Sequence, residues 1–199
     1  MQNTKMMYRL AFLLLIGFLA ACQKSAPPAH FHASDVTGKY AQAGFHLTDY
    51  NGKPRSLSDF KGKVVAIFFG YTHCPDVCPT TLAKLSQTLR LLGKDADRVQ
   101  VLFVTVDPER DTRGILAQFV PAFNPAFLGL SGDAKATADA AKSFGVDYQK
   151  VPAKHGYYMD HSTFTYLVDA SGRVRLMAGD REPADWLAED IRQLLASAQ

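Results

Sequence analysis

A continuous apolar run, KVVAIFFGY at residues 63–71, is rich in β-branched and aromatic side chains. Runs of this kind are typical of strands that are covered on both faces. The period then changes, and leucines recur at steps of three and four residues along one stripe: Leu82, Leu85, Leu89 and Leu92. The pattern therefore predicts a buried central strand followed by an amphipathic helix over residues 74–93, ended by Gly93.

The rest of the chain continues this alternation. Residues 45–50 precede Asn51-Gly52, a pair that supplies the positive φ angles of a tight hairpin turn. The other predicted elements are strand 100–106, helix 111–120, strand 127–130, helix 133–144, strands 164–168 and 174–178 around a turn at 169–172, and helix 183–195. The order β-α-β-α-β-α-β-β-α predicts an α/β fold, a mixed central sheet flanked by helices, with an added N-terminal β-hairpin.

The N-terminus has the pattern of an export signal. Lys5 and Arg9 precede an apolar run at residues 10–20, which is short for a membrane span of about 20 residues. The run ends in Leu-Ala-Ala-Cys22, which resembles the lipobox of bacterial lipoproteins, where the chain is cleaved before the cysteine and the cysteine is then lipidated. An ordinary signal peptide that leaves a free cysteine is the alternative. We expect a lipoprotein signal peptide over residues 1–21 and a lipid on Cys22, which would anchor the protein to a membrane of the bacterial cell envelope on its extracytoplasmic side.

Residues 22–38 are small, polar and proline-bearing, so they predict a flexible tether ahead of a folded domain at 39–199. His30 and His32 in this tether could bind Cu(II) weakly, or could simply be solvated. Two of the 22 basic residues and none of the 19 acidic residues lie in residues 1–21, so their removal lowers the formal charge from +3 to +1. A nearly neutral chain without a basic run gives no support to nucleic-acid binding.

The candidate chemistry lies in two short motifs. Cys74 and Cys78 occur in YTHCPDVCP, where the strand passes into the helix, and His161 occurs about 80 residues downstream in MDHSTF. Two sulfurs and one imidazole make a three-ligand set suited to Cu(I), whereas a structural zinc site usually has a fourth ligand. The same two cysteines could instead perform thiol redox chemistry. A stabilising disulfide, or an interaction module with permanently oxidised cysteines, are further alternatives.

The spacing of the cysteines allows each of these states. If the helix is already formed at Cys74, residues i and i+4 share a face and their Cα atoms lie about 6 Å apart. That separation permits either chelation or a Cys74–Cys78 disulfide. Free N–H groups at the helix N-terminus would favour the thiolate.

Three segments now resemble a known family. LTDYNGKPRSLSDFKGKVVAIFFGYTHCPDVCP, VTVDPERDT and DHSTFTYLVDASGRV follow one another as in the SCO/SenC family of thioredoxin-like copper proteins, and the resemblance covers nearly all of residues 40–195. The resemblance implies a thioredoxin-like fold with Cys74, Cys78 and His161 as copper ligands. It also identifies residues 107–111 with the DPxRD loop of the family.

The resemblance further implies a function as a copper metallochaperone that takes copper from a donor protein. Its partner would be the copper-bearing subunit of cytochrome c oxidase, at the binuclear copper centre. The alternative is an enzyme, a thiol-disulfide oxidoreductase that keeps the cysteines of that subunit reduced with Cys74 and Cys78 as its redox pair. A lipid on Cys22 would be a departure, because many relatives carry a transmembrane helix instead.

Several neighbours of these residues are secondary candidates. His73 precedes Cys74 and could tune its thiolate, Met159 offers a thioether that suits Cu(I), and Asp160 could orient the imidazole of His161. Core packing for Met159 and a turn role for Asp160 are the alternatives. Asp107 and Arg110 could form a structural ion pair or contact a partner.

Overall fold

The computed structural model describes residues 30–197. Its helices are α2 (Val77–Leu92), α3 (Arg113–Phe119), α4 (Ala134–Phe144) and α5 (Ala184–Ala196), with short 3-10 turns at Leu57–Phe60 and Gly93–Arg98. Its strands are β1 (Ser34–Asp35), β2 (His46–Asp49), β3 (Pro54–Ser56), β4 (Val64–Gly70), β5 (Val99–Thr105), β6 (Leu128–Ser131), β7 (Tyr148–Ala153), β8 (Gly156–His161), β9 (Thr165–Val168) and β10 (Val174–Ala178).

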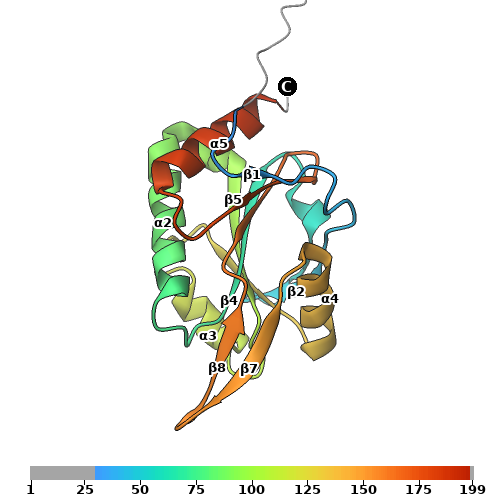
Figure 1. The fold of residues 1–199 in the computed structure, drawn as a ribbon, viewed down its shortest axis with the longest axis vertical. Helices are drawn as coiled ribbons and strands as arrows, with labels where there is room; N and C mark the ends of the chain where they lie inside the picture. Colours follow the sequence, from blue (N-terminus) through green and yellow to red (C-terminus); the bar gives the residue numbers. More distant parts are fainter. Residues whose placement is uncertain (1–29, 198–199) are drawn as a thin grey trace, which may run out of the picture. The chain divides into compact units, whose positions relative to one another are not determined.

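One large mixed sheet forms the centre of the fold. Its eight strands follow the order β1-β10-β9-β4-β5-β6-β2-β3, in which β4, β5 and β6 are parallel and the other pairs are antiparallel. All seven residues of β4 are buried, as its apolar run predicted. Helices α2 and α5 cover one face of the sheet and α4 covers the other (Figure 1). The predicted α/β fold and the N-terminal hairpin β2–β3 are confirmed.

A second, two-stranded sheet was not predicted. Strands β7 and β8 pair only with each other and project from one end of the domain (Figure 1). They occupy a stretch in which polar and apolar residues are mixed and Pro152 interrupts the apolar pattern. This hairpin matters for the site, because His161 is its last residue.

The expected tether ends earlier than the sequence indicated. Strand β1 pairs with β10, and the flanking side chains of Ala33 and Val36 are buried. The carboxylate of Asp190 in α5, itself fully buried, accepts hydrogen bonds of 2.9 Å from the backbone N–H groups of His32 and Ala33. The folded part therefore begins near residue 31 rather than at residue 39, because this segment adds a strand and satisfies a buried carboxylate.

The signal peptide and Cys22 lie outside the described residues. Within residues 30–197, no helix is both long enough and apolar enough to cross a membrane. His32 stacks on Trp186, with ring centroids 4.8 Å apart, and its Nε2 lies 2.7 Å from the carboxylate of Glu189. The ring of His32 therefore packs on α5, whereas a solvated ring was one expectation for a residue in a linker.

Candidate metal centre

Helix α2 begins later than the sequence indicated. Its first residue is Val77, so Cys78 lies in the first turn while Cys74 lies in the preceding loop. Pro75 follows Cys74 directly, and the residue before a proline is disfavoured in helical conformation. The idea that both cysteines share one helical face is therefore wrong. A backbone hydrogen bond of 3.3 Å from the N–H of Cys74 to the carbonyl of Tyr71 holds the loop in a turn instead.

The sulfur of Cys78 lies directly above the end of β4. Cys78 is completely buried, and a Cβ atom added at Gly70 would lie 2.8 Å from its Sγ. The same added atom would come within about 3 Å of the rings of Phe68 and Phe103. Only glycine leaves room for the sulfur at this position. The sequence did carry a signal for this contact, a small residue closing a run of bulky ones.

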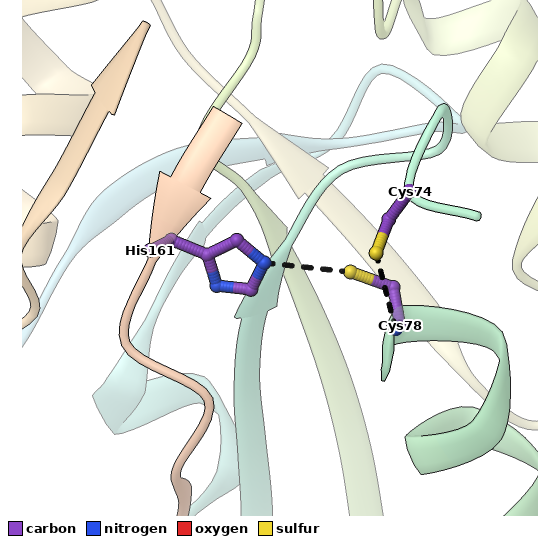
Figure 2. A group of neighbouring side chains, drawn as sticks. All are labelled: Cys74, Cys78 and His161. Atoms are coloured by element: carbon purple, nitrogen blue, oxygen red, sulfur yellow. Dashed lines mark hydrogen bonds between the residues drawn. The ribbon is translucent and has the colours of Figure 1, made fainter. Parts of the chain in front are cut away.

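Three possible ligand atoms meet at this point (Figure 2). The sulfurs of Cys74 and Cys78 and the imidazole of His161 lie within 4.8 Å of one another. Cys78 Sγ is 3.6 Å from His161 Nε2, and the backbone N–H of Cys78 donates to Cys74 Sγ over 3.5 Å. Among residues 30–197 this is the group of His, Cys and acidic side chains that could hold a metal ion. The three residues singled out in the sequence are thus brought together.

The imidazole of His161 is fixed in one orientation. Its Nδ1 lies 2.9 Å from the backbone oxygen of Ser162, and because a carbonyl can only accept, Nδ1 carries the proton and donates it. Nε2 is then unprotonated, and it faces the thiol of Cys78. Two aromatic rings, those of Phe68 and Tyr71, meet the imidazole edge-on at centroid distances of 6.1 and 5.8 Å. Burial lowers the pKa of His161, which keeps the ring neutral and able to bind metal.

The two thiols differ in their surroundings. Burial strongly raises the pKa of Cys78, so this group stays a thiol unless a metal ion displaces its proton. Cys74 is partly exposed and accepts the hydrogen bond from the first turn of α2. Both cysteines are free in the structure. Their surroundings suit a reduced pair that binds a soft metal, with Cys74 as the accessible sulfur.

The loop that carries Cys74 is anchored by a residue that the sequence did not single out for this role. Asp111 is fully buried, and its carboxylate accepts hydrogen bonds from the backbone N–H and the hydroxyl of Thr72, at 3.0 and 2.6 Å. The hydroxyl of Thr105 donates to the same carboxylate over 2.6 Å. Asp111 thereby connects the end of β5 to the loop two residues before Cys74.

Three of the secondary candidates, Asp160, Met159 and His73, lie outside the group of ligand atoms. Asp160 does not orient His161 through a hydrogen bond; the backbone oxygen of Ser162 does so, and Asp160 instead accepts a long hydrogen bond of 3.5 Å from Gln149. Met159 is buried in β8, as expected for core packing. His73 is half exposed and its Nδ1 lies 3.1 Å from the hydroxyl of Thr72, outside the group of ligand atoms.

The predicted ion pair between Asp107 and Arg110 is present. It is part of a larger contact, because the hydroxyl of Tyr157 in β8 donates to Asp107 over 2.9 Å and the guanidinium of Arg110 donates to the carbonyl of Tyr157 over 2.9 Å. This loop therefore contacts the hairpin that supplies His161.

The mixed sheet with its helices, together with a Cys-Cys-His cluster at the end of β4, defines a thioredoxin-like domain with a candidate metal centre. The family model SCO1/SenC matches residues 34–196. The chain therefore belongs to the SCO1/SenC family, as the resemblance indicated.

Individual relatives agree with this assignment. The mitochondrial SCO2 homologue of Mus musculus is 39% identical over 160 residues, which are 78% of this chain and 63% of the relative. The chain thus spans less than two thirds of that protein. The copper-bound structure of Bradyrhizobium japonicum ScoI is 44% identical with a TM-score of 0.72, covering 77% of this chain and 98% of that one. The apo Sco1 protein of Thermus thermophilus is 38% identical with a TM-score of 0.74, covering 85% and 100%.

Proposed function

We propose that this protein is a copper metallochaperone that binds Cu(I) through Cys74, Cys78 and His161. The observation that carries the proposal is the convergence of two sulfurs and an unprotonated imidazole nitrogen within 4.8 Å of one another. On the buried side of this group, residue 70 must be glycine to leave room for the sulfur of Cys78. Thiolate and imidazole are the ligands that Cu(I) prefers, and three ligands leave a position open to an incoming group.

The geometry supports a simple binding sequence. In the metal-free protein the thiol of Cys78 donates to Nε2 of His161, because Nδ1 holds the other proton. Copper replaces the thiol proton between these two atoms, and Cys74 adds the second sulfur from the exposed side. Binding therefore releases protons from the cysteines and needs no change in the tautomer of His161.

The proposed recipient is the copper-bearing subunit of cytochrome c oxidase. Bradyrhizobium japonicum ScoI and yeast Sco1 are both described as copper-bound, the latter at 32% identity and a TM-score of 0.71. BsSco, at 25% identity and a TM-score of 0.64, is described as a member of the Sco family of cytochrome c oxidase assembly proteins. Delivery would proceed by ligand exchange, in which a thiolate of the recipient replaces one of the three ligands. A separate donor would reload the site.

The test is an anaerobic Cu(I) titration of the reduced protein against a competing chelator. We expect one Cu(I) per wild-type protein, and an affinity at least about 10-fold weaker in His161→Ala. His155→Ala is the matched control, since His155 is an exposed histidine at the tip of the same hairpin. Equal affinity of wild type and His161→Ala would overturn the three-ligand site.

A second candidate function is a thiol-disulfide oxidoreductase. It is favoured by one observation, the N–H of Cys78 that points at the partly exposed sulfur of Cys74, since such contacts stabilise a thiolate. In this function Cys74 attacks a disulfide of the partner, and Cys78 then resolves the mixed disulfide while the partner leaves as a dithiol. This candidate predicts that Cys78→Ser abolishes oxidase assembly in cells while His161→Ala leaves it intact. The copper proposal predicts that both variants abolish it.

We also propose that a lipid on Cys22 attaches the protein to a membrane of the cell envelope, on the extracytoplasmic side. The lipobox-like sequence before Cys22 supports this proposal. Cys22→Ala should release the protein from the membrane fraction of cells, and retention of the variant in that fraction would contradict the lipid anchor.

A further inference from the structure

The β7–β8 hairpin brings His161 to the thiols, yet it has no strand pairing with the main sheet. Strands with a period of two place Tyr157, Met159 and His161 on the same side of β8, and Tyr158 and Asp160 on the other. The first three are buried or partly buried and the last two are exposed. The position of the imidazole therefore depends on side-chain contacts along the inner side of this hairpin.

Tyr157 makes the densest set of these contacts. The guanidinium of Arg110 lies 3.7 Å from the centroid of the Tyr157 ring, and the ammonium group of Lys150 lies 4.3 Å from it. Arg110 also donates to the carbonyl oxygen of Tyr157, while the phenol hydroxyl donates to Asp107. Arg110 is in turn paired with Asp107. One arginine thus holds the backbone and the ring of a residue four positions before His161.

Arg110 is also connected to the imidazole of His161 through a second ring, that of Tyr71. Its guanidinium lies 5.8 Å from the ring centroid of Tyr71, and that ring also makes the edge-to-face contact with His161. Tyr71 is nearly completely buried, so it cannot move away without opening the core. The cation is therefore placed between two tyrosines, one on the hairpin and one beside the imidazole.

The neighbouring residue, Asp111, fixes the loop that carries Cys74. It does so through its hydrogen bonds to Thr72, as described above. The adjacent residues 110 and 111 thus connect one short loop to both the imidazole side and the thiol side. Neither residue belongs to the group of ligand atoms, so this loop supports the site and is not a part of it.

We propose that Arg110 is a positioning residue that clamps the β7–β8 hairpin through Tyr157 and thereby sets how readily His161 leaves copper. The proposal rests on the proposed copper function. In the exchange step a Cu–S bond to the acceptor thiolate forms as the Cu–N bond to Nε2 breaks. Copper stays Cu(I), no electron is transferred, and Nε2 becomes a free acceptor again. A firmly held hairpin keeps the imidazole close and slows this exchange.

The first experiment uses the reduced, metal-free protein, so it does not depend on copper. Nitrogen-15 labelling of histidine reports the tautomer of each ring by NMR. At about pH 8 we expect wild-type His161 to be protonated at Nδ1 alone, whereas Arg110→Gln should show a mixture of tautomers with broadened signals. Arg110→Lys keeps the charge but loses the planar stacking, so it should be intermediate. Wild-type signals in both folded variants would overturn the proposal.

The second experiment measures the transfer of Cu(I) to a chromophoric chelator by stopped flow. Arg110→Gln should release copper about 10-fold faster than wild type. In a His161→Ala background the same substitution should have no further effect, because the imidazole through which it acts is gone. An equal acceleration in both backgrounds would contradict the proposal.

Lys150→Gln is the matched control for both experiments. It removes the other cation on the Tyr157 ring and the surface pair with Glu109, but leaves the contacts of Arg110. It should resemble wild type, and a change as large as that of Arg110→Gln would assign the effect to general loosening of the hairpin. Tyr157→Leu removes the ring on which Arg110 stacks, so it should reproduce the effect of Arg110→Gln. The proposal therefore stays testable if Arg110→Gln does not fold. Absence of Cu(I) binding to wild type would remove the proposed function, and the NMR experiment would still decide the role of Arg110.

Discussion

At the scale of single residues, the site depends on the absence of a side chain at Gly70. Its backbone is ordinarily extended, so alanine would be tolerated there except for the sulfur and rings above it. The apolar run and the CxxxC spacing predicted the ligands. A sequence, however, contains no measure of the distance between the end of a strand, here Gly70, and the sulfur of Cys78 in the following helix. The small residue that closes the run of bulky ones was a signal at residue 70, but only the structure shows that the sulfur of Cys78 and two aromatic rings fill the space above it.

We expect Gly70→Ala to lower the free energy of unfolding by about 1–3 kcal/mol, since the added methyl group overpacks a filled core. It should also weaken Cu(I) binding, because Cys78 must shift away from Nε2. Urea unfolding and chelator competition measure the two effects. Gly114→Ala in α3 is the control: its nearest contact would be 3.9 Å away, so it should gain up to about 1 kcal/mol without changing copper binding. Undiminished binding in Gly70→Ala would contradict the packing argument.

The lowered pKa of His161 makes a prediction about pH. Because burial opposes the charged ring, the unfolded chain takes up this proton at a higher pH than the folded protein does. Stability is therefore lost as pH falls below about 6.5, and it is unaffected by this group above that value. Metal-free wild type should lose more stability between about pH 7.5 and about pH 5 than His161→Gln. Urea unfolding at both pH values is the measurement, and equal losses would show that His161 titrates normally.

At the scale of elements, the central strands and helices followed from the hydrophobic pattern, whereas the hairpin that carries His161 did not. β4 is buried on both faces, so its residues are uniformly apolar. Strand β7 has exposed and partly buried positions without a strict alternation and contains Pro152, because it pairs with only one neighbour and projects from the domain. Its sequence is therefore under weaker constraint. The inward positions Tyr157, Met159 and His161 were the signal of period two that could have revealed β8.

The isolation of this hairpin predicts its dynamics. Two-stranded sheets are marginal on their own, so β7 and β8 should open without unfolding of the main sheet. In metal-free protein, we expect the bonded amides of β7 and β8 to exchange with solvent roughly 100-fold faster than those of β4 and β5. Hydrogen exchange followed by NMR tests this, and Cu(I) should slow exchange in β8 because it ties His161 to the thiols. Equal protection of the two sheets would contradict the expectation.

At the scale of the whole molecule, strand β1 lies near α5 at one end of the domain, and the β7–β8 hairpin projects from the opposite end (Figure 1). The composition of residues 30–38 suggested a solvated tether because it is small and polar. Its docking depends on backbone N–H groups that meet the buried Asp190, and a backbone contact leaves no trace in the side chains of the segment. The family relationship, in contrast, could be read from three motifs.

Asp190→Ala should lower the free energy of unfolding by about 1–3 kcal/mol, because two backbone N–H groups lose their acceptor. Cu(I) affinity should be unchanged, since Asp190 binds the backbone of His32 and Ala33 and is not part of the ligand group. Asp185→Ala is the control on the exposed side of α5, with an expected cost of at most about 1 kcal/mol. Urea unfolding and chelator competition decide between a local and a global effect, and a fall in copper affinity would show that the N-terminal segment and the site are coupled.

The short strand β1 has one more consequence, for self-association. A sheet edge with unpaired N–H and C=O groups is a template for the strand of another molecule. At one edge β3 is three residues long and contains Pro54. At the other, β1 covers Leu176 and Met177 of β10, and Val36 adds a hydrogen bond to Arg175. A shortened protein that begins at residue 39 would lose this cover, so we expect it to aggregate more readily than a protein that keeps β1.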